Sequence, residues 1–166
     1  MFFVESSVTS HICPVCKETL RYRDSRQRIR KKEGGEKEHL MIRRFRCDHC
    51  HSYHNELPDC LVPYKHYETE VICGVLDGVV SPDDLESEDY PSFITMLRWL
   101  QWFNENLERI QGYLRTIAYT HLGLGEDILF SQDSLLDVIR NKYQDWLEKI
   151  LRLIYNSGGF LVPIRW

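Results

Sequence analysis

The chain has 166 residues and a formal net charge of −4, so it can hold one medium domain or two small ones. Hydrophobic residues make up 43% of it, enough for a packed core, which excludes an intrinsically disordered protein. No apolar run approaches the length of a membrane span, and the start at Met1 lacks the basic region of a secretion signal. We therefore expect a cytoplasmic protein that does not associate with membranes.

Two CxxC pairs, thirty residues apart, dominate the N-terminal part of the chain. Each CxxC turn can point two thiolates at one centre, and four such ligands complete the tetrahedral shell of Zn²⁺. A closed shell of four sulfurs holds structure and leaves no coordination position for a substrate. We predict one structural zinc ion with the ligands Cys13, Cys16, Cys47 and Cys50.

Other uses of these cysteines are disfavoured. A redox dithiol is expected within a βαβ pattern, which neither pair has, and disulfides do not suit the reducing compartment expected without a signal peptide. A mixed site stays open, because His11, His49, His51 or His54 could replace one cysteine. We favour four cysteines, since two CxxC pairs already complete the shell.

The spacer between the two pairs has the pattern of a β-hairpin. Residues 20–23 and 39–46 mix apolar and basic side chains in a strand-like way, and residues 33–36 supply a turn. Such a hairpin would bring Cys16 beside Cys47. We predict a zinc ribbon with a basic β-hairpin over residues 1–62.

Charge is distributed unevenly along the chain. Residues 17–46 carry twelve Lys or Arg against five Asp or Glu, a net charge of +7, whereas residues 63–166 carry nine against sixteen, a net charge of −7. A basic hairpin is typical of phosphate binding, although it could also serve solubility alone. We favour nucleic acid, with double-stranded DNA as the partner and contacts from Arg21, Arg23, Arg26, Arg28, Arg30, Lys31, Lys32, Arg43 and Arg44.

After a Pro-rich connector, residues 63–107 have the pattern of three helices. The first spans residues 67–76 and stops near Gly78, the second is short and starts at Ser81, and the third runs from Phe93 to about Leu107. Short joints between them predict a helix-turn-helix, whose second helix enters the DNA major groove. We expect Phe93, Leu97, Leu100 and Leu107 to face inward, and Ser92, Thr95, Arg98 and Gln101 to face the groove.

The remaining residues, 108–166, are predicted to be a C-terminal helical region. One apolar stripe runs from Leu107 to Ile117, and a long helix starts near Ser131 and ends at residues 157–159. We favour a bundle packed on the rest of the protein over a surface for a partner or a homodimer. The predicted fold class is therefore mostly α with a small N-terminal β zinc ribbon, and a helix-turn-helix followed by a C-terminal helical bundle.

The connector, residues 57–67, between the double CxxC ribbon and the motif Pro91-Ser92-x-x-Thr95-x-x-x-Trp99-x-x-Trp102-Phe103 resembles an uncharacterised bacterial family. Members of that family resemble the N-terminal part of insertion-sequence transposases and occur in mobile elements. The similarity covers most of residues 11–107. It implies a zinc ribbon and a DNA-reading helix-turn-helix in a Gram-positive bacterium, with a transposase or another protein as a further partner.

The sequence has no P-loop, dinucleotide fingerprint, GxSxG elbow or HExxH motif, and we predict that the protein is not an enzyme. Two functions fit the patterns. The first is a DNA-binding accessory or regulatory protein of a mobile element, with zinc in a structural role. The second is a protein–protein adaptor that uses the ribbon and the bundle as a scaffold.

Overall fold

The computed structural model describes residues 1–4, 6–83, 91–122 and 134–163. The chain divides into two compact units. Of the described residues, 1–4 and 6–71 belong to the first unit, and 72–83, 91–122 and 134–163 belong to the second. Within these ranges no helix combines the length and the apolar character that crossing a bilayer requires.

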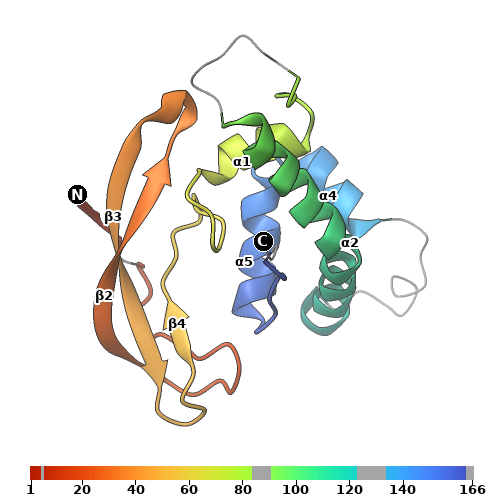
Figure 1. Ribbon diagram of the computed structural model, residues 1–166. Helices are drawn as coiled ribbons and strands as arrows, with labels where there is room; N and C mark the ends of the chain where they lie inside the picture. The colour runs from red at the N-terminus through yellow and green to blue at the C-terminus, as the bar shows by residue number, and fades with distance from the viewer. Residues whose placement is uncertain (5, 84–90, 123–133, 164–166) are drawn as a thin grey trace. The chain divides into compact units, whose positions relative to one another are not determined.

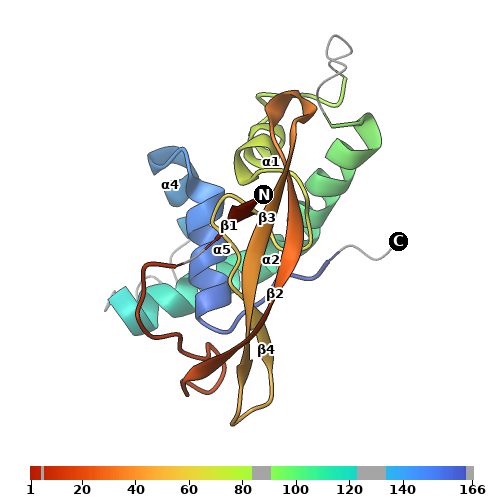
Figure 2. The ribbon, with the colours of Figure 1, turned by 90° about the vertical axis from the view of Figure 1, so that its left-hand side faces the viewer.

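The first unit is built on a four-stranded mixed sheet. Strands β2 (Leu20–Lys31) and β3 (Lys37–Cys47) form a long antiparallel hairpin, joined by the 3-10 turn η1 (Glu33–Gly35) (Figure 1). Strands β1 (Phe2–Phe3), parallel to β3, and β4 (Tyr53–Asn55), antiparallel to β3, pair along the other edge of β3. The predicted hairpin is confirmed, with the turn at one end and β4 at the other in both views (Figures 1 and 2).

One face of the hairpin is covered near its tip. The connector runs beside β2, where Lys31 bridges to Tyr67, and it brings Leu61 and Val62 into the core with Leu40 and Ile42 of β3. These four apolar side chains are almost completely buried. The connector therefore covers the tip half of this face, and side chains that β2 directs toward it are shielded from solvent.

The second unit is helical. Helix α1 (Thr69–Leu76) starts in the first unit and ends in the second, and it is followed by α2 (Phe93–Leu122), α4 (Leu135–Lys142) and α5 (Trp146–Asn156). Helices α2, α4 and α5 pack on one another. Phe103 of α2 meets Trp146 of α5 edge to face, with 5.6 Å between the ring centroids. Such aromatic packing supplies a large part of the buried apolar area.

Asp77, directly after α1, connects three helices. Its carboxylate accepts hydrogen bonds from the guanidinium of Arg140 on α4 (2.6 Å) and from the indole N–H of Trp146 on α5 (2.8 Å). Burial raises the pKa of Asp77, but these two donors outweigh it and hold the pKa below its usual value. The carboxylate is thus charged and fixes the start of α5 relative to the end of α1.

The predicted fold class, mostly α with a helix-turn-helix and a helical bundle, is wrong. The mixed sheet gives the chain about 23% strand against 41% helix, so it is not plainly dominated by helices. The third predicted helix does not end near Leu107: α2 is 30 residues long and continues to Leu122. No proline interrupts it, and its one glycine, Gly112, lies off the apolar stripe of Ile110, Leu114 and Ile117. Residues 81–83 form a turn, and the rest of the predicted short second helix, 84–87, lies outside the described residues.

The predicted long C-terminal helix is two helices. Tyr143 has an extended backbone (φ −128°, ψ 130°) that ends α4 and lets α5 start at Trp146. Its predicted first residues, 131–133, lie outside the described ranges. The prediction for the inward face of α2 is also wrong in part: Phe93 and Leu97 are 48% and 41% exposed, whereas Met96 is buried. Ile110, predicted within the apolar stripe, is buried as expected.

The C-terminal peptide docks on α2 through a buried asparagine. The side-chain amide of Asn106 accepts a hydrogen bond from the backbone N–H of Val162 (2.8 Å) and donates one to the carbonyl of Val162 (3.0 Å). The amide thus bonds to both backbone polar groups of one residue. The next residue toward the N-terminus, Leu161, is buried. A buried amide without partners would be costly, and this pairing satisfies it.

We expect Asn106→Ala to lower the free energy of unfolding by about 1–3 kcal/mol, because the backbone groups of Val162 lose their partner. Urea denaturation followed by circular dichroism would measure the change. Asn104→Ala is the matched control, since Asn104 lies exposed on the same helix and should change stability by less than about 0.5 kcal/mol. Equal losses of stability in both variants would contradict the role of Asn106.

Candidate metal centre and nucleic-acid interface

The hairpin brings the four predicted cysteines together at its open end. Their sulfur atoms all lie within 4.8 Å of one another, with 3.6 Å between Cys13 and Cys50 and 3.4 Å between Cys16 and Cys47. Four sulfurs about 2.3 Å from one tetrahedral ion would be about 3.8 Å apart. All six cysteines of the chain are free thiols. The cluster therefore fits one metal ion, and the prediction that these four residues converge is confirmed.

Both CxxC turns have the same backbone shape. The N–H of Cys13 bonds to the carbonyl of Glu18, and that of Cys47 to the carbonyl of Ser52, so each turn closes back on its first cysteine. The residue after each second cysteine, Lys17 or His51, has a left-handed φ, 67° and 59° respectively. Glycine favours that region, but neither position is a glycine, so the sequence did not reveal the equivalence of the two turns.

Thiol ionisation in the cluster is strongly perturbed. Burial raises the pKa of Cys13, but backbone N–H groups of Cys16 and Val15 outweigh it and bring the pKa to about 5. The backbone N–H of Glu18 lowers the pKa of Cys16, yet burial and the neighbouring sulfurs raise it to about 12. Because four thiolates at this distance repel one another, the full set of charged ligands requires a cation.

The histidines considered as alternative ligands lie outside the cluster. His49 and His51 are exposed, and the ring of His11 packs on Phe45 with 4.3 Å between centroids and a tilt of 44°. His54 comes nearest: its Nε2 atom lies 3.5 Å from the sulfur of Cys13 and 2.7 Å from the hydroxyl of Ser52. In the part of the chain that is described, the four cysteines alone form a group of metal-ligand atoms.

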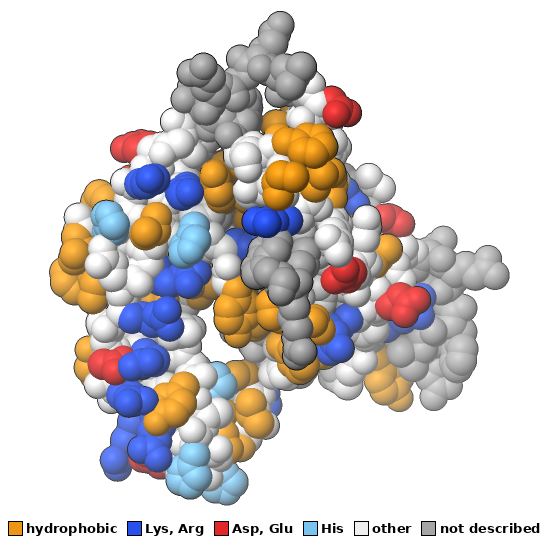
Figure 3. Space-filling view, viewed as in Figure 1, with side chains coloured by type: hydrophobic (Ala, Val, Ile, Leu, Met, Phe, Trp, Pro, Cys, Tyr) orange, Lys and Arg blue, Asp and Glu red, His pale blue; other side chains and the backbone are white. Residues whose placement is uncertain are grey.

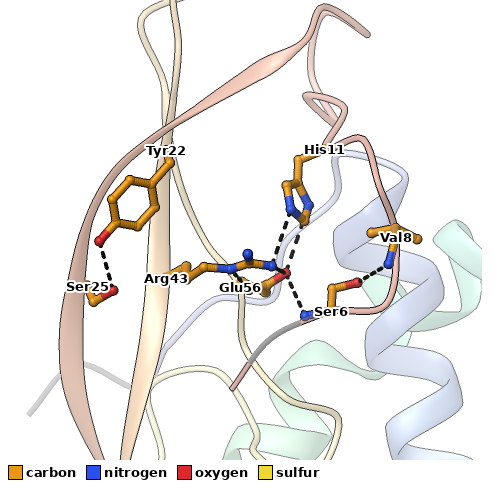
Figure 4. Close-up of polar contacts among 7 residues, drawn as sticks. All are labelled: Ser6, Val8, His11, Tyr22, Ser25, Arg43 and Glu56. Atoms are coloured by element: carbon orange, nitrogen blue, oxygen red, sulfur yellow. Dashed lines mark hydrogen bonds and ion pairs between the residues drawn. The ribbon is translucent and has the colours of Figure 1, made fainter. Parts of the chain in front are cut away.

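A polar cluster anchors the segment that leads to the first CxxC turn (Figure 4). Arg43 of β3 donates two hydrogen bonds to the carboxylate of Glu56, at 2.6 and 2.9 Å, and Glu56 also accepts from the backbone N–H of Ser6. Burial raises the pKa of Glu56, but the Arg43 guanidinium outweighs it and holds the pKa below its usual value. Arg43, predicted to contact nucleic acid, is instead bound within the protein.

Several other residues predicted to contact nucleic acid are also occupied internally. Arg30 bonds to Glu38 and Glu68 at 2.9 and 3.0 Å, and Arg28 donates to the carbonyl of Lys65. Two more bind carboxylates, Arg44 that of Asp24 and Lys32 that of Glu38, while Lys31 lies over the ring of Tyr67. The alternation of arginines on β2 was predicted correctly, but the connector covers the face toward which Arg28 and Arg30 point.

The open half of the same face keeps exposed arginines. Arg21 of β2 pairs with Arg46 of β3, which pairs with Tyr53 of β4, and directly opposed residues share one face of a sheet. A bulge between Tyr22 and Asp24 brings the guanidinium of Arg23 to 4.6 Å from the centroid of the Tyr53 ring. We call Arg21, Arg23, Arg26, Arg46 and Tyr53 the basic sheet face; Figure 3 shows Lys and Arg side chains gathered over the hairpin.

Sequence reasoning missed Arg46 and Tyr53. Arg46 is exposed and its guanidinium lies 5.9 Å from the centroid of the Tyr53 ring, which is itself 51% exposed. Arg21 does contact Asp48 at 2.9 Å, but both side chains are more than half exposed, where an ion pair contributes little. The period of two along β3, which places Arg46 and Arg44 on one face, could have located Arg46. No such signal marks Tyr53, because its position beside Arg46 depends on the register of β4.

The residues predicted to enter the major groove have other surroundings. Ser92 accepts a hydrogen bond from the N–H of Thr95 at the start of α2, as a helix cap does, and Gln101 donates to Glu105 one turn later. Arg98 is exposed on the same helix. Most of the predicted second helix lies outside the described residues, so the contacts of these four residues with a DNA groove stay a prediction.

One protein-family comparison matches the chain. The family described as Domain of unknown function (DUF6431) matches residues 13–99, which start at Cys13 and include β2, β3, β4 and α1. The chain belongs to this family. No curated protein and no solved structure matches. The family match does not connect the chain to transposases, so its association with mobile elements stays a prediction.

We expect Lys17→Gly to raise the free energy of unfolding of the metal-loaded protein by about 1 kcal/mol. The left-handed backbone at this position is strained for lysine, and relief of that strain exceeds the entropy that glycine adds to the unfolded chain. Urea denaturation would measure the gain. Lys17→Ala keeps the strain and serves as the control, so an equal gain in both variants would rule out the backbone explanation.

Proposed function

We propose that this protein is a DNA-binding protein in which a structural zinc ion holds a basic sheet surface in place. The observation that carries the proposal is the basic sheet face beside the four-cysteine cluster. Arg21, Arg23, Arg26 and Arg46 remain exposed there, while other arginines of the hairpin are occupied by internal partners. Exposed guanidinium groups on one surface are suited to phosphate oxygens.

Zinc is the ion that best suits the donor set. Four thiolates that converge on one point favour a soft or borderline ion with tetrahedral geometry, and Zn²⁺ has no competing geometric preference. When bound, it would neutralise part of the thiolate charge and join the two CxxC turns. A shell of four sulfurs leaves no open position, which supports a binding role rather than a catalytic one.

We expect one zinc ion per chain by elemental analysis, and its loss on treatment with a chelator. Removal should abolish amide protection from hydrogen exchange in β3 and β4 while helices α2 and α5 keep theirs, because metal affinity of this kind is also folding free energy. Cys47→Ser should lower the bound zinc. Cys60→Ser, outside the cluster, should keep one ion, and equal zinc content in both variants would reject the site.

The charge of the basic sheet face can be tested without disturbing the core. Arg21→Ala, Arg23→Ala and Arg46→Ala together should weaken DNA binding at least about tenfold. They should also flatten the dependence of log affinity on log salt, by about 0.7–0.9 for each phosphate that the variant no longer binds. Fluorescence anisotropy of labelled DNA over a salt series measures both quantities.

The matched control removes three charges elsewhere. Arg109→Ala, Lys142→Ala and Arg152→Ala change the net charge by the same amount on exposed helix positions of the second unit. We expect these substitutions to leave the salt slope unchanged. If both triple variants lose affinity equally, binding depends on net charge alone and the basic sheet face has no specific role.

A protein–protein adaptor is the second candidate. The observation that favours it is an apolar patch at the start of α2, where Phe93, Ile94 and Leu97 are 48%, 52% and 41% exposed. Exposed apolar side chains grouped in this way are typical of surfaces that bind another protein. Full DNA binding by the Arg21, Arg23 and Arg46 variant would favour this second function.

A further inference from the structure

Tyr53 places an exposed aromatic ring among the arginines of the basic sheet face. It belongs to a strand of only three residues, and its side chain is 51% exposed beside the guanidinium groups of Arg23 and Arg46. About half of the side chain is thus accessible to a ligand. A flat ring next to two cations is suited to a ligand that has both a flat ring and a negative charge.

The width of the sheet restricts the form of DNA that can reach this ring. A major groove admits an α-helix or a ribbon of two strands. At Tyr53 the sheet has three strands, because β3 pairs with β2 along one edge and with β4 along the other. Arg21, Arg46 and Tyr53 form one row across these three strands. With strands about 4.8 Å apart, this row is about 10 Å wide before side chains are added. The basic sheet face is therefore too broad to insert into the groove.

The narrower part of the hairpin does not offer an alternative. Toward the tip the connector covers this face, and Arg30 and Lys32 are neutralised by Glu38 and Glu68. The turn itself contains Glu33 and Glu36, which would repel phosphates. Lys37 is exposed there too, but it stands beside these acidic residues. The exposed arginines thus lie on the broad, flat part that carries Tyr53.

We propose that the basic sheet face binds single-stranded DNA, with an unpaired base stacked on Tyr53 and the neighbouring phosphates bound by Arg21, Arg23 and Arg46. This inference rests on the proposed DNA-binding function and specifies the form of DNA. Stacking needs only the flat face of a base, so the site accepts different sequences. Paired bases are already stacked within the duplex and cannot reach the ring, so duplex DNA contacts the arginines alone.

Tyr22 provides a matched control on the same hairpin. It is 58% exposed, but it pairs with Phe45 and therefore lies on the opposite face of the sheet from Tyr53. Its hydroxyl bonds to Ser25 at 3.1 Å. If any exposed tyrosine of the hairpin could stack a base, substitution of either Tyr22 or Tyr53 would weaken DNA binding. The proposed site predicts that only substitution of Tyr53 does so.

The experiment compares the zinc-loaded protein with its Tyr53→Leu, Tyr53→Trp and Tyr22→Leu variants by fluorescence anisotropy. The probes are a 15-nucleotide oligo-dT and a duplex of the same length, each over a salt series. We expect Tyr53→Leu to weaken oligo-dT binding by about 5- to 150-fold, the range for one stacked base, with an unchanged salt slope. Tyr53→Trp should restore affinity, and its fluorescence should be quenched on binding. Tyr22→Leu should bind as the unmodified protein does.

Each result decides between the two proposals. If neither probe binds at low salt, the DNA-binding function is rejected together with this inference. If DNA binds but Tyr53→Leu has full affinity for oligo-dT, the stacking site is rejected and DNA binding stands. If Tyr53→Leu loses zinc or Tyr53→Trp also loses binding, Tyr53 has a structural role only, and the stacking site is likewise rejected.

Discussion

Mutual repulsion among four cysteine sulfurs is the constraint on which the first unit depends. The sulfurs lie within 4.8 Å of one another, and this proximity helps to raise the pKa of Cys16 to about 12. A divalent ion would remove that penalty and would join residues 13–16 to residues 47–50. The same link closes the open end of the β2–β3 hairpin. It also sets the start of β4, because Tyr53 follows Cys50 by only three residues. Strand pairing, the CxxC turns and the basic sheet face therefore depend on one centre.

Internal ion pairing determines which cations remain for a ligand. Near the hairpin tip, Arg30 lies between Glu38 and Glu68; near the cluster, Arg43 binds Glu56 and Arg44 binds Asp24. Each pair uses a carboxylate close to its arginine in the fold, so the high positive charge of residues 17–46 is partly neutralised within the first unit. The arginines that remain exposed gather on one face of the sheet, and the exposed Lys37 lies apart from them beside the hairpin turn. A count of arginines in the sequence overestimates the surface available to a ligand, because it does not distinguish arginines in internal ion pairs from exposed ones.

Local patterns predicted the parts of the fold that local physics determines. The CxxC spacing, the turn at residues 33–36 and the alternation along β2 located the cysteine cluster and the hairpin correctly. Predictions failed where tertiary packing decides. An uninterrupted apolar stripe does not say where α2 ends, and the break at Tyr143 follows from the docking of Trp146 onto Asp77, which is distant in sequence. The bulge at Arg23 and the pairing of Arg46 with Tyr53 depend on register, which no spacing rule specifies.

Under the proposed function, metal binding and DNA binding would be linked in both directions. A strand as short as β4 has too few backbone hydrogen bonds to hold Tyr53 in place by itself, so the stacking ring needs the cluster. Conversely, four thiolates around one divalent ion carry a net charge of −2, which the arginines at the same end of the hairpin offset. Phosphates bound to these arginines would compete with the metal centre for their positive charge, while a bound DNA strand would stabilise the ordered sheet. In the proposed function the metal ion would thus be a component of the DNA-binding surface, because the positions of the arginines and of the Tyr53 ring would both depend on it.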